Sequence, residues 1–324
     1  QAGLGLPERE YYRRTDGVFP EQRRQDAATI ANILTLAGQS DGEAKAARIL
    51  AFETRIAELH WPIADRRERE RTYNLRSRAQ VRGLAPRFPW DAGFDAAGLG
   101  AVEEIVVGEL SAIGPLAELC LATPVSTWRD YITWHYINGN ASVLPRTIDN
   151  ASFDFYGRTL NGQPQQRERW KRAISSVNNV LGEAVGEIYV QRHFSAEAKA
   201  QTLQLVENMR RAYGERISSS TWMSAETKTA ALEKLATFRP KIGYPDRWRD
   251  YSQLEIRAGD AFGNAVRFAQ WTWAHELDRL GKPSDREEWF MVPHAVNAYY
   301  NPPFNEIVFV VAFGSAGATA DAVG

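Results

Sequence analysis

One stretch of this sequence has the residue types of a zinc hydrolase motif, and the motif there is incomplete. His275-Glu276-Leu277-Asp278-Arg279 begins the His-Glu-x-x-His arrangement. On a helix, that spacing places two imidazole ligands on one face, with a carboxylate beside them to activate water. Arg279 stands where the second imidazole would be, and its positive charge would repel a metal ion. We therefore predict that His275 is an ordinary helix residue and that this chain holds no metal.

The other four histidines are scattered along the chain. His60 and His135 lie among aromatic residues, a setting typical of structural histidines. His193 comes just before a predicted helix, where a packing or capping role is expected. His294 lies just ahead of an apolar segment near the end of the chain, and it is the one histidine whose surroundings favour a functional role.

The sequence also lacks the motifs of a catalytic nucleophile and of a nucleotide-binding site. The sequence has no Gly-x-Ser-x-Gly elbow, no Walker loop and no Gly-x-Gly-x-x-Gly after a strand. Cys120 is the only cysteine, and its neighbours Leu119 and Leu121 are those of an inert thiol. From its own residues, the chain is predicted to carry no catalytic residues.

Composition places the chain among ordinary globular proteins. Its 324 residues are 44% hydrophobic and 24% charged, with a net charge of −1, so no nucleic-acid partner is expected. No run of 18 apolar residues occurs, so no membrane span is expected. The first residues lack an initiator Met and a signal core and read like a start in mid-protein, so the compartment cannot be deduced.

Apolar residues recur at helical spacing along most of the chain. Two predicted helices have serine caps, at Ser195 and Ser224. Gly114-Pro115 is read as a break between two short helices, and residues 83–100, rich in Gly, Pro and aromatics, as an irregular crossing. In the long helix near 165–190, Gly182 and Gly186 would allow a close helix–helix approach. One predicted helix is capped by Ser126 or Thr127 and carries Trp128 and His135. The other predicted helices cover about 21–37, 43–60, 102–113, 116–122, 165–190, 195–217, 225–238 and 260–280.

A β-hairpin is predicted over residues 296–311. Two β-branched and aromatic runs flank Asn301-Pro302-Pro303-Phe304-Asn305, where the prolines cannot join a sheet ladder and the chain should reverse. It is the only strong strand signal in the chain. An edge strand here could pair its unused N–H and C=O groups with an extended peptide, although a hairpin that merely packs has the same pattern. The last residues, 314–324, are small and are expected to form a flexible tail.

The hairpin segment resembles the neprilysin family of zinc metallopeptidases. The similarity runs in order from residue 1 to about 309. Its motifs include Gly3-Leu4-Gly5-Leu6-Pro7 with Tyr11-Tyr12, then Tyr73-Asn74, Trp128, Tyr131, Trp134, Trp170, Lys241-Ile242-Gly243-Tyr244-Pro245, Val296-Asn297-Ala298-Tyr299-Tyr300 and Asn305-Glu306-Ile307-Val308-Phe309.

The resemblance implies a zinc endopeptidase that cleaves peptides in a chamber between a helical lobe and a thermolysin-like α+β catalytic lobe. The chain would be mainly helical, with a helical lobe over 1–260, a crossing segment near 72–100, and the opening part of the catalytic lobe over 261–324. In the family, the Asn-Ala pair holds the substrate backbone beside the zinc. The resemblance therefore implies peptide contacts for Asn297 and Ala298, and less directly for Tyr299. An extracytoplasmic location is also implied.

The family's zinc ligands lie beyond the hairpin and are not in this chain, so zinc is expected only in the complete enzyme. Three interpretations stay open. The chain could be a portion of an active peptidase that joins the remaining catalytic segment. It could instead be a catalytically inactive peptide-binding or scaffold module derived from the family. Finally, the sequence after Phe309, where Val310-Val311-Ala312-Phe313 and a Gly/Ala tail replace the family's continuation, could be an altered reading of a longer enzyme.

Overall fold

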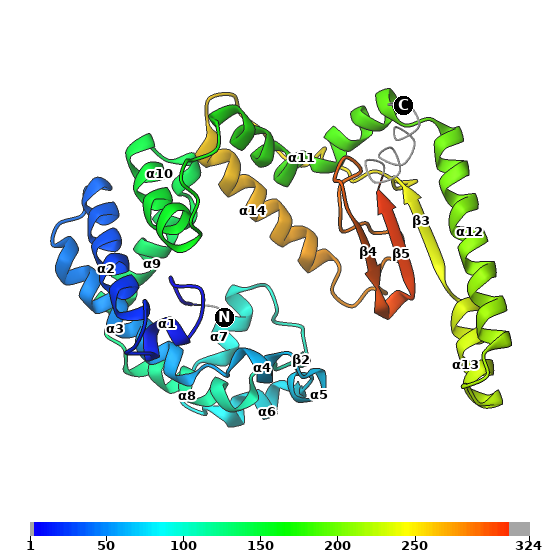
Figure 1. Cartoon of the computed structure of the whole chain (residues 1–324). Helices are drawn as coiled ribbons and strands as arrows, with labels where there is room; N and C mark the ends of the chain where they lie inside the picture. Colours follow the sequence, from blue (N-terminus) through cyan, green and yellow to red (C-terminus); the bar gives the residue numbers. More distant parts are fainter. Residues whose placement is uncertain (1–2, 311–324) are drawn as a thin grey trace. The chain divides into compact units, whose positions relative to one another are not determined.

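A computed structural model describes residues 3–310 of the chain. The described residues pack as two compact units (Figure 1). Unit 1 contains residues 3–166 and 256–278, and unit 2 contains residues 167–255 and 279–310. The chain therefore crosses between the units three times. The predicted boundary at residue 260 concerns the lobes of the whole protein and stays a prediction, and the tail 314–324 lies outside the described residues.

Unit 1 is almost entirely helical, as predicted. It has one short antiparallel strand pair, β1 (Leu75–Ser77) with β2 (Glu104–Val106), and two irregular helical turns, η1 (Ala141–Val143) and the π-helical η2 (Phe153–Leu160). Its α-helices are α1 (Glu10–Arg13), α2 (Phe19–Leu36), α3 (Gly42–Leu59), α4 (Ile63–Arg66), α5 (Arg69–Thr72), α6 (Arg78–Leu84), α7 (Trp90–Ala96), α8 (Leu110–Ala122), α9 (Val125–Gly139), α10 (Arg146–Ser152) and α14 (Ala261–Asp278).

The core of unit 1 lies where α2 and α3 pack against α9 and α10. Ile30, Ile33 and Ile49 are fully buried there around Trp134, which is also fully buried. A second cluster joins α3 to α8 and α9 through Phe52, whose ring meets those of Trp128 and Tyr131 edge to face. The periodic apolar stripe of each helix therefore faces its neighbours, as the sequence predicts.

The region between residues 83 and 122 differs from the prediction. The expected irregular crossing contains α6 and α7, and the expected helix from Val102 is wrong because β2 occupies residues 104–106. Helix α8 begins at Leu110 and continues through Pro115. A side-chain carbon on Gly114 would lie 2.6 Å from the carbonyl oxygen of Leu84. Gly114 is thus used for close packing against the end of α6, and it does not mark a break.

Unit 2 combines three helices with one small sheet. The caps predicted at Ser195 and Ser224 are confirmed, because the Ser195 hydroxyl accepts from the Ala198 N–H and that of Ser224 from the Thr227 N–H. The cap expected at Ser126 or Thr127 is wrong, because α9 of unit 1 already begins at Val125. A kink at Leu181 interrupts the first helix of unit 2. The elements are α11 (Arg169–His193), α12 (Ala196–Ser219), α13 (Ala225–Ala236), β3 (Arg239–Gly243), β4 (Ala298–Asn301), the 3-10 turn η3 (Pro302–Phe304) and β5 (Glu306–Val310).

The sheet of unit 2 has the order β3-β5-β4, with β5 in the middle (Figure 1). The predicted hairpin is confirmed: β4 and β5 are antiparallel, and Asn305 closes the turn in the left-handed conformation at a φ of 51°. Strand β3, which pairs in parallel with β5, was missed. Its Pro240 argues against a central strand, but an edge strand tolerates proline.

Among residues 3–310, no single helix has the length and apolar composition needed to cross a membrane. Only α8 and α9 taken together pass that test, and the pair is bent by 112° at its break.

Candidate peptide-binding edge

Strand β4 forms one edge of the three-stranded sheet of unit 2, so one side of its backbone is unpaired within the described sheet. Its residues pair with β5 in the register Ala298–Phe309, Tyr299–Val308, Tyr300–Ile307 and Asn301–Glu306. In an antiparallel ladder, alternate residues of an edge strand direct both N–H and C=O away from the partner strand. The edge is therefore able to accept another strand.

Asn297 identifies which residues face outward. Its side-chain oxygen accepts a hydrogen bond of 2.8 Å from the N–H of Ala298. Because this N–H is bound to Asn297, we infer that it points away from β5. By the alternation of the ladder, the backbone of Tyr300 then faces outward too, whereas Tyr299 and Asn301 bond to β5.

Tyr299, the third predicted site residue, packs its ring inward. It lies against a cluster of Trp289, Val308 and Val310, and its hydroxyl accepts from the N–H of Phe290 at 3.0 Å. Burial raises the pKa of this hydroxyl. The side chain of Tyr299 thus supports the strand, while the neighbouring Tyr300 is 43% exposed.

A buried ion pair lies beneath the edge. Glu306 is on the buried face of β5 and is fully buried, and Lys241 of β3 is 5% exposed. The Lys241 ammonium lies 3.1 Å from both Glu306 carboxylate oxygens and also donates to the carbonyl of Glu288. Glu306 further accepts from the side chain of Asn301 in β4. The pair links all three strands, and breaking it by removing one partner would leave a buried charge uncompensated.

Two glycines of α11 hold the segment that leads into β4. A side-chain carbon on Gly182 would lie 2.5 Å from Val292, and one on Gly186 would lie 2.6 Å from the ring of Pro293. The close approach expected from the Gly182–Gly186 spacing is therefore present. Its partner is the chain segment before β4, and not another helix as predicted. The glycines thereby fix the entry into the edge strand.

His294 lies three positions before Asn297 and packs its ring near Tyr189 of α11, with a centroid distance of 5.9 Å. Neither ring nitrogen has a hydrogen-bond partner among residues 3–310. Burial lowers the pKa of this imidazole, because the charged form would lose its hydration. The structure therefore gives His294 a packing contact beside the edge.

The remaining four histidines have structural settings. His193, the last residue of α11, packs its ring 4.8 Å from that of Tyr189. His135 bonds to buried Glu53 at 2.8 Å, and His60 is 7% exposed beside Glu109. His275 stacks on Trp271, and α14 ends at Asp278, so Arg279 lies beyond the helix and donates to Glu288 at 2.9 Å. Among the described residues, no three His, Cys, Asp or Glu side chains are grouped so that they could hold a metal ion.

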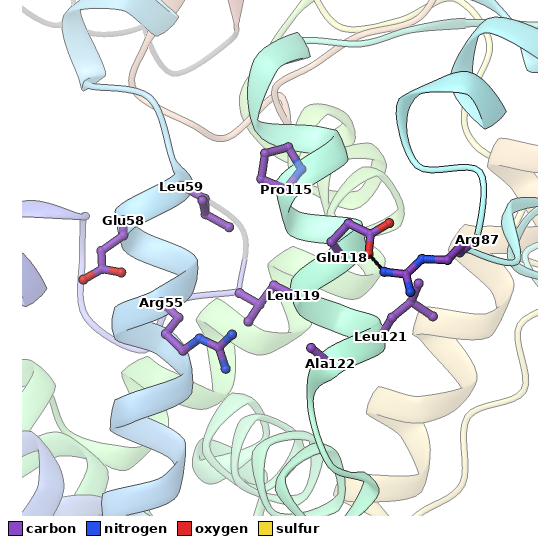
Figure 2. Close-up of a pocket in the computed structure, with 9 residues that line it drawn as sticks. All are labelled: Arg55, Glu58, Leu59, Arg87, Pro115, Glu118, Leu119, Leu121 and Ala122. Carbon is purple, nitrogen blue, oxygen red and sulfur yellow. Dashed lines mark hydrogen bonds and ion pairs between the residues drawn. The ribbon is translucent and has the colours of Figure 1, made fainter.

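Unit 1 has a hollow of its own, of 510 Å³, between α3 and α8 (Figure 2). Arg87 and Glu118 form an ion pair on one side of it, and Arg55 and Glu58 project from α3 on the other. Apolar side chains, Leu119 among them, line the rest. None of the predicted site residues lies here, so the edge of β4 is the stronger candidate.

Sequence reasoning proposed Asn297 and Ala298 as peptide contacts through a resemblance, which stays a prediction, and missed Lys241 and Glu306 as a pair. The available signal was a charged residue at an apolar position of each strand. Glu306 occupies the same face as Val308 and Val310, which requires a partner charge on a neighbouring strand.

Comparison with known proteins supports the resemblance. Residues 1–245 match the model of Peptidase family M13. Human endothelin-converting enzyme 1 is 30% identical over 95% of this chain, which covers 42% of that protein. Neprilysin-3 of Drosophila melanogaster is 29% identical, with 95% of this chain and 42% of the relative covered.

Two solved structures extend the comparison. The zinc metalloprotease Zmp1 of Mycobacterium tuberculosis, in complex with an inhibitor, superposes with a TM-score of 0.88 at 40% identity, covering 97% of this chain and 48% of that chain. PepO from Lactobacillus rhamnosis gives a TM-score of 0.79 at 26% identity, covering 96% of this chain and 50% of that chain. The chain thus spans half or less of the length of these relatives. With most of its length matched by the family model, this chain belongs to Peptidase family M13.

Proposed function

We propose that this chain is a portion of a neprilysin-like zinc endopeptidase and that it supplies the helical lobe and one wall of the substrate site. The observation that carries the proposal is the edge of β4, where the amide of Asn297 lies beside outward-facing backbone groups of Ala298 and Tyr300. An extended peptide would add a strand there. Main-chain hydrogen bonds give affinity with little sequence selectivity, as an enzyme that cleaves varied peptides requires.

The metal of the complete enzyme would be held outside this chain. The described residues have no group suited to zinc, so we assign none of them to the metal and derive no step through it. The role of this chain is to bind and align the peptide. The Asn297 amide NH₂ would donate to a substrate carbonyl, and the carbonyl of Ala298 would accept from a substrate N–H.

Exposed apolar helix faces favour packing against another segment of the same protein. Trp170, Ile174 and Val177 recur at helical spacing on α11 and are 58%, 50% and 45% exposed. Such a stripe normally packs against another element. We propose that the remaining catalytic segment covers faces of this kind and closes the peptide chamber. Following the family resemblance, we also propose an extracytoplasmic location.

The intact mass and the zinc content of the source protein test the proposal directly. We expect a mass near twice that of this 36.4 kDa chain, together with one zinc per molecule. A 36.4 kDa protein without zinc would instead favour the alternative of a non-catalytic peptide-binding module, since the β4 edge can bind a peptide without a metal.

Replacement of Asn297 tests the role of the edge. In the complete enzyme, Asn297→Ala should lower kcat/KM for a fluorogenic peptide by roughly 10- to 100-fold, because a hydrogen bond to the substrate and the partner of the Ala298 N–H are both removed. Asn208→Ala, on the exposed surface of α12, is the matched control and should have no effect. Equal activity of the two variants would exclude a substrate contact by Asn297.

A further inference from the structure

A hollow of 520 Å³ lies beside β4 and the turn that follows it, entirely within unit 2. Both Tyr299 and Tyr300 line it, although successive side chains of a strand point to opposite faces. The hollow therefore follows the edge of the strand and does not lie over one face of the sheet. It is continuous with the edge that we propose to bind the peptide backbone.

Four aromatic residues and two prolines line the hollow, beside polar and charged groups. Phe290 and Tyr300 present rings that are 58% and 43% exposed, and Phe304 of the turn completes the lining. The guanidinium of Arg286 lies over the ring of Phe304 at 5.2 Å and supports it. Exposed rings gathered around one hollow favour an apolar occupant, because each loses water contact when covered.

The charged groups of the hollow are already paired. Arg279 donates to Glu288 at 2.9 Å, and Asp285 accepts from Arg247 at 2.5 Å and from the N–H of Glu287 at 2.8 Å. A charged occupant would lose its hydration and find no uncompensated charge to pair with, whereas an aromatic ring has no charge to desolvate. The chemistry of the site therefore selects against acidic and basic side chains.

The direction of the strand gives the position along the peptide. Strand β4 runs from Ala298 to Asn301 and then into the turn. A peptide that pairs antiparallel with β4 has the opposite direction, so its N-terminal residues lie at the Asn301 end. The hollow lies at this far end of the strand, near Tyr300 and residues 301–304. It would thus meet a side chain two to four residues before the one that pairs with Ala298.

We propose that this hollow is a specificity pocket that takes an aromatic side chain of the peptide, on the amino-terminal side of the cleaved bond. The inference rests on the proposed function, in which the Asn297-Ala298 pair lies beside the reacting bond. The pocket would make the enzyme selective for the peptide residue at a position away from that bond. The backbone contacts of the edge alone would not discriminate between peptide sequences.

The test uses the complete enzyme and a series of internally quenched peptides that are identical except at one position. Phe, Ala, Asp or Lys is placed at the second, third or fourth residue before the cleaved bond, and kcat/KM is measured for each peptide. At one of these positions, we expect Phe to exceed Ala by roughly tenfold or more, and Asp and Lys not to exceed Ala. Phe304→Ala should reduce the preference for Phe, while Trp222→Ala, an 80% exposed aromatic of the same unit, should retain it.

The affinities of the same peptides, fluorescein-labelled, are measured by polarisation with the metal removed by a chelator, so that the pocket is tested even without cleavage. Tighter binding of the Phe peptide supports the pocket. Cleavage with no preference at these three positions, or a preference only after the cleaved bond, would overturn the pocket and leave the proposed function standing. Absence of cleavage by the zinc-loaded enzyme would instead overturn the proposed function, and the Phe-to-Ala affinity ratio would then decide the pocket.

Discussion

At the scale of single residues, the peptide edge depends on how Asn297 distributes its hydrogen bonds. The side-chain oxygen accepts from Ala298, which leaves the NH₂ group to donate. The same side chain therefore binds the backbone at the start of the edge strand and, in the proposed function, would offer a donor to a peptide. Asparagine suits this proposed dual role because it combines an acceptor and a donor on one short side chain.

Asp26 is the most unusual single residue of unit 1. It is fully buried in α2, and neither carboxylate oxygen has a hydrogen-bond partner among residues 3–310. Burial, followed by the nearby charge of Glu53, raises its pKa to about 8. Glu53 is also fully buried but accepts from the Gly5 N–H, the Tyr12 hydroxyl and His135. Asp26 thus remains protonated in the folded protein at neutral pH.

This protonation predicts a pH-dependent stability. The folded-state pKa of Asp26, about 8, exceeds the ordinary value of 3.8. Between these pH values the folded protein therefore keeps a proton on Asp26 that the unfolded chain has lost. The contribution of Asp26 to the free energy of unfolding should then fall as pH rises, by about 1.4 kcal/mol per pH unit, and level off above pH 8. Asp26→Asn, which mimics the neutral acid, should gain stability relative to the wild type from pH 5 to 8.

Urea unfolding of the protein at pH 5, 6.5 and 8 measures the difference. Asp41→Asn is the matched control, because Asp41 is exposed and asparagine tolerates its left-handed φ of 56°. A constant difference between Asp26→Asn and the wild type across the three pH values would contradict a neutral Asp26.

At the scale of elements, the helices follow from sequence and the sheet only in part. The serine caps at Ser195 and Ser224 and the apolar stripes are local signals, so the helix ends near them were predictable. Strand β3 was not, because its partner β5 is distant in sequence and its own segment contains Pro240. Likewise, the Lys241–Glu306 pair and the burial of Asp26 depend on tertiary packing, which a single sequence does not reveal.

The contact of α11 with the segment before β4 gives a prediction at the same scale. Gly186→Ala would place a methyl group 2.6 Å from the ring of Pro293, which cannot rotate away. We expect a loss of about 1–3 kcal/mol in the free energy of unfolding and weaker peptide binding, because the segment leading to Asn297 must move.

Gly214→Ala is the matched control for that substitution. It lies within α12 of the same unit, and an added methyl group would meet only Leu235 at an ordinary distance of 3.6 Å. This variant should gain about 0.5–1 kcal/mol from the higher helix propensity of alanine. The predicted crowding at Pro293 would be wrong if both variants gained stability.

At the scale of the whole molecule, we propose that the fold of this part of the chain does not depend on the zinc that the complete enzyme would bind. The described residues group no metal ligands, so zinc should not hold this part of the chain together. Treating the complete enzyme with 1,10-phenanthroline should abolish peptide hydrolysis but leave the helical signal in far-UV circular dichroism nearly unchanged. Re-addition of zinc should restore activity. A large loss of helix on chelation would show that the metal supports the helical lobe.

The interleaving of the two units also has a consequence for how the protein folds as it is made. Lys241 of β3 pairs with Glu306 of β5, which lies 65 positions further along the chain. Helix α14, which belongs to unit 1, lies between them in the sequence. At about 5–20 residues per second, a ribosome takes several seconds to add that stretch. During this interval β3 has no partner strand and the lysine has no counter-charge. The last segment of the helical unit is therefore synthesised before the sheet of unit 2 can form.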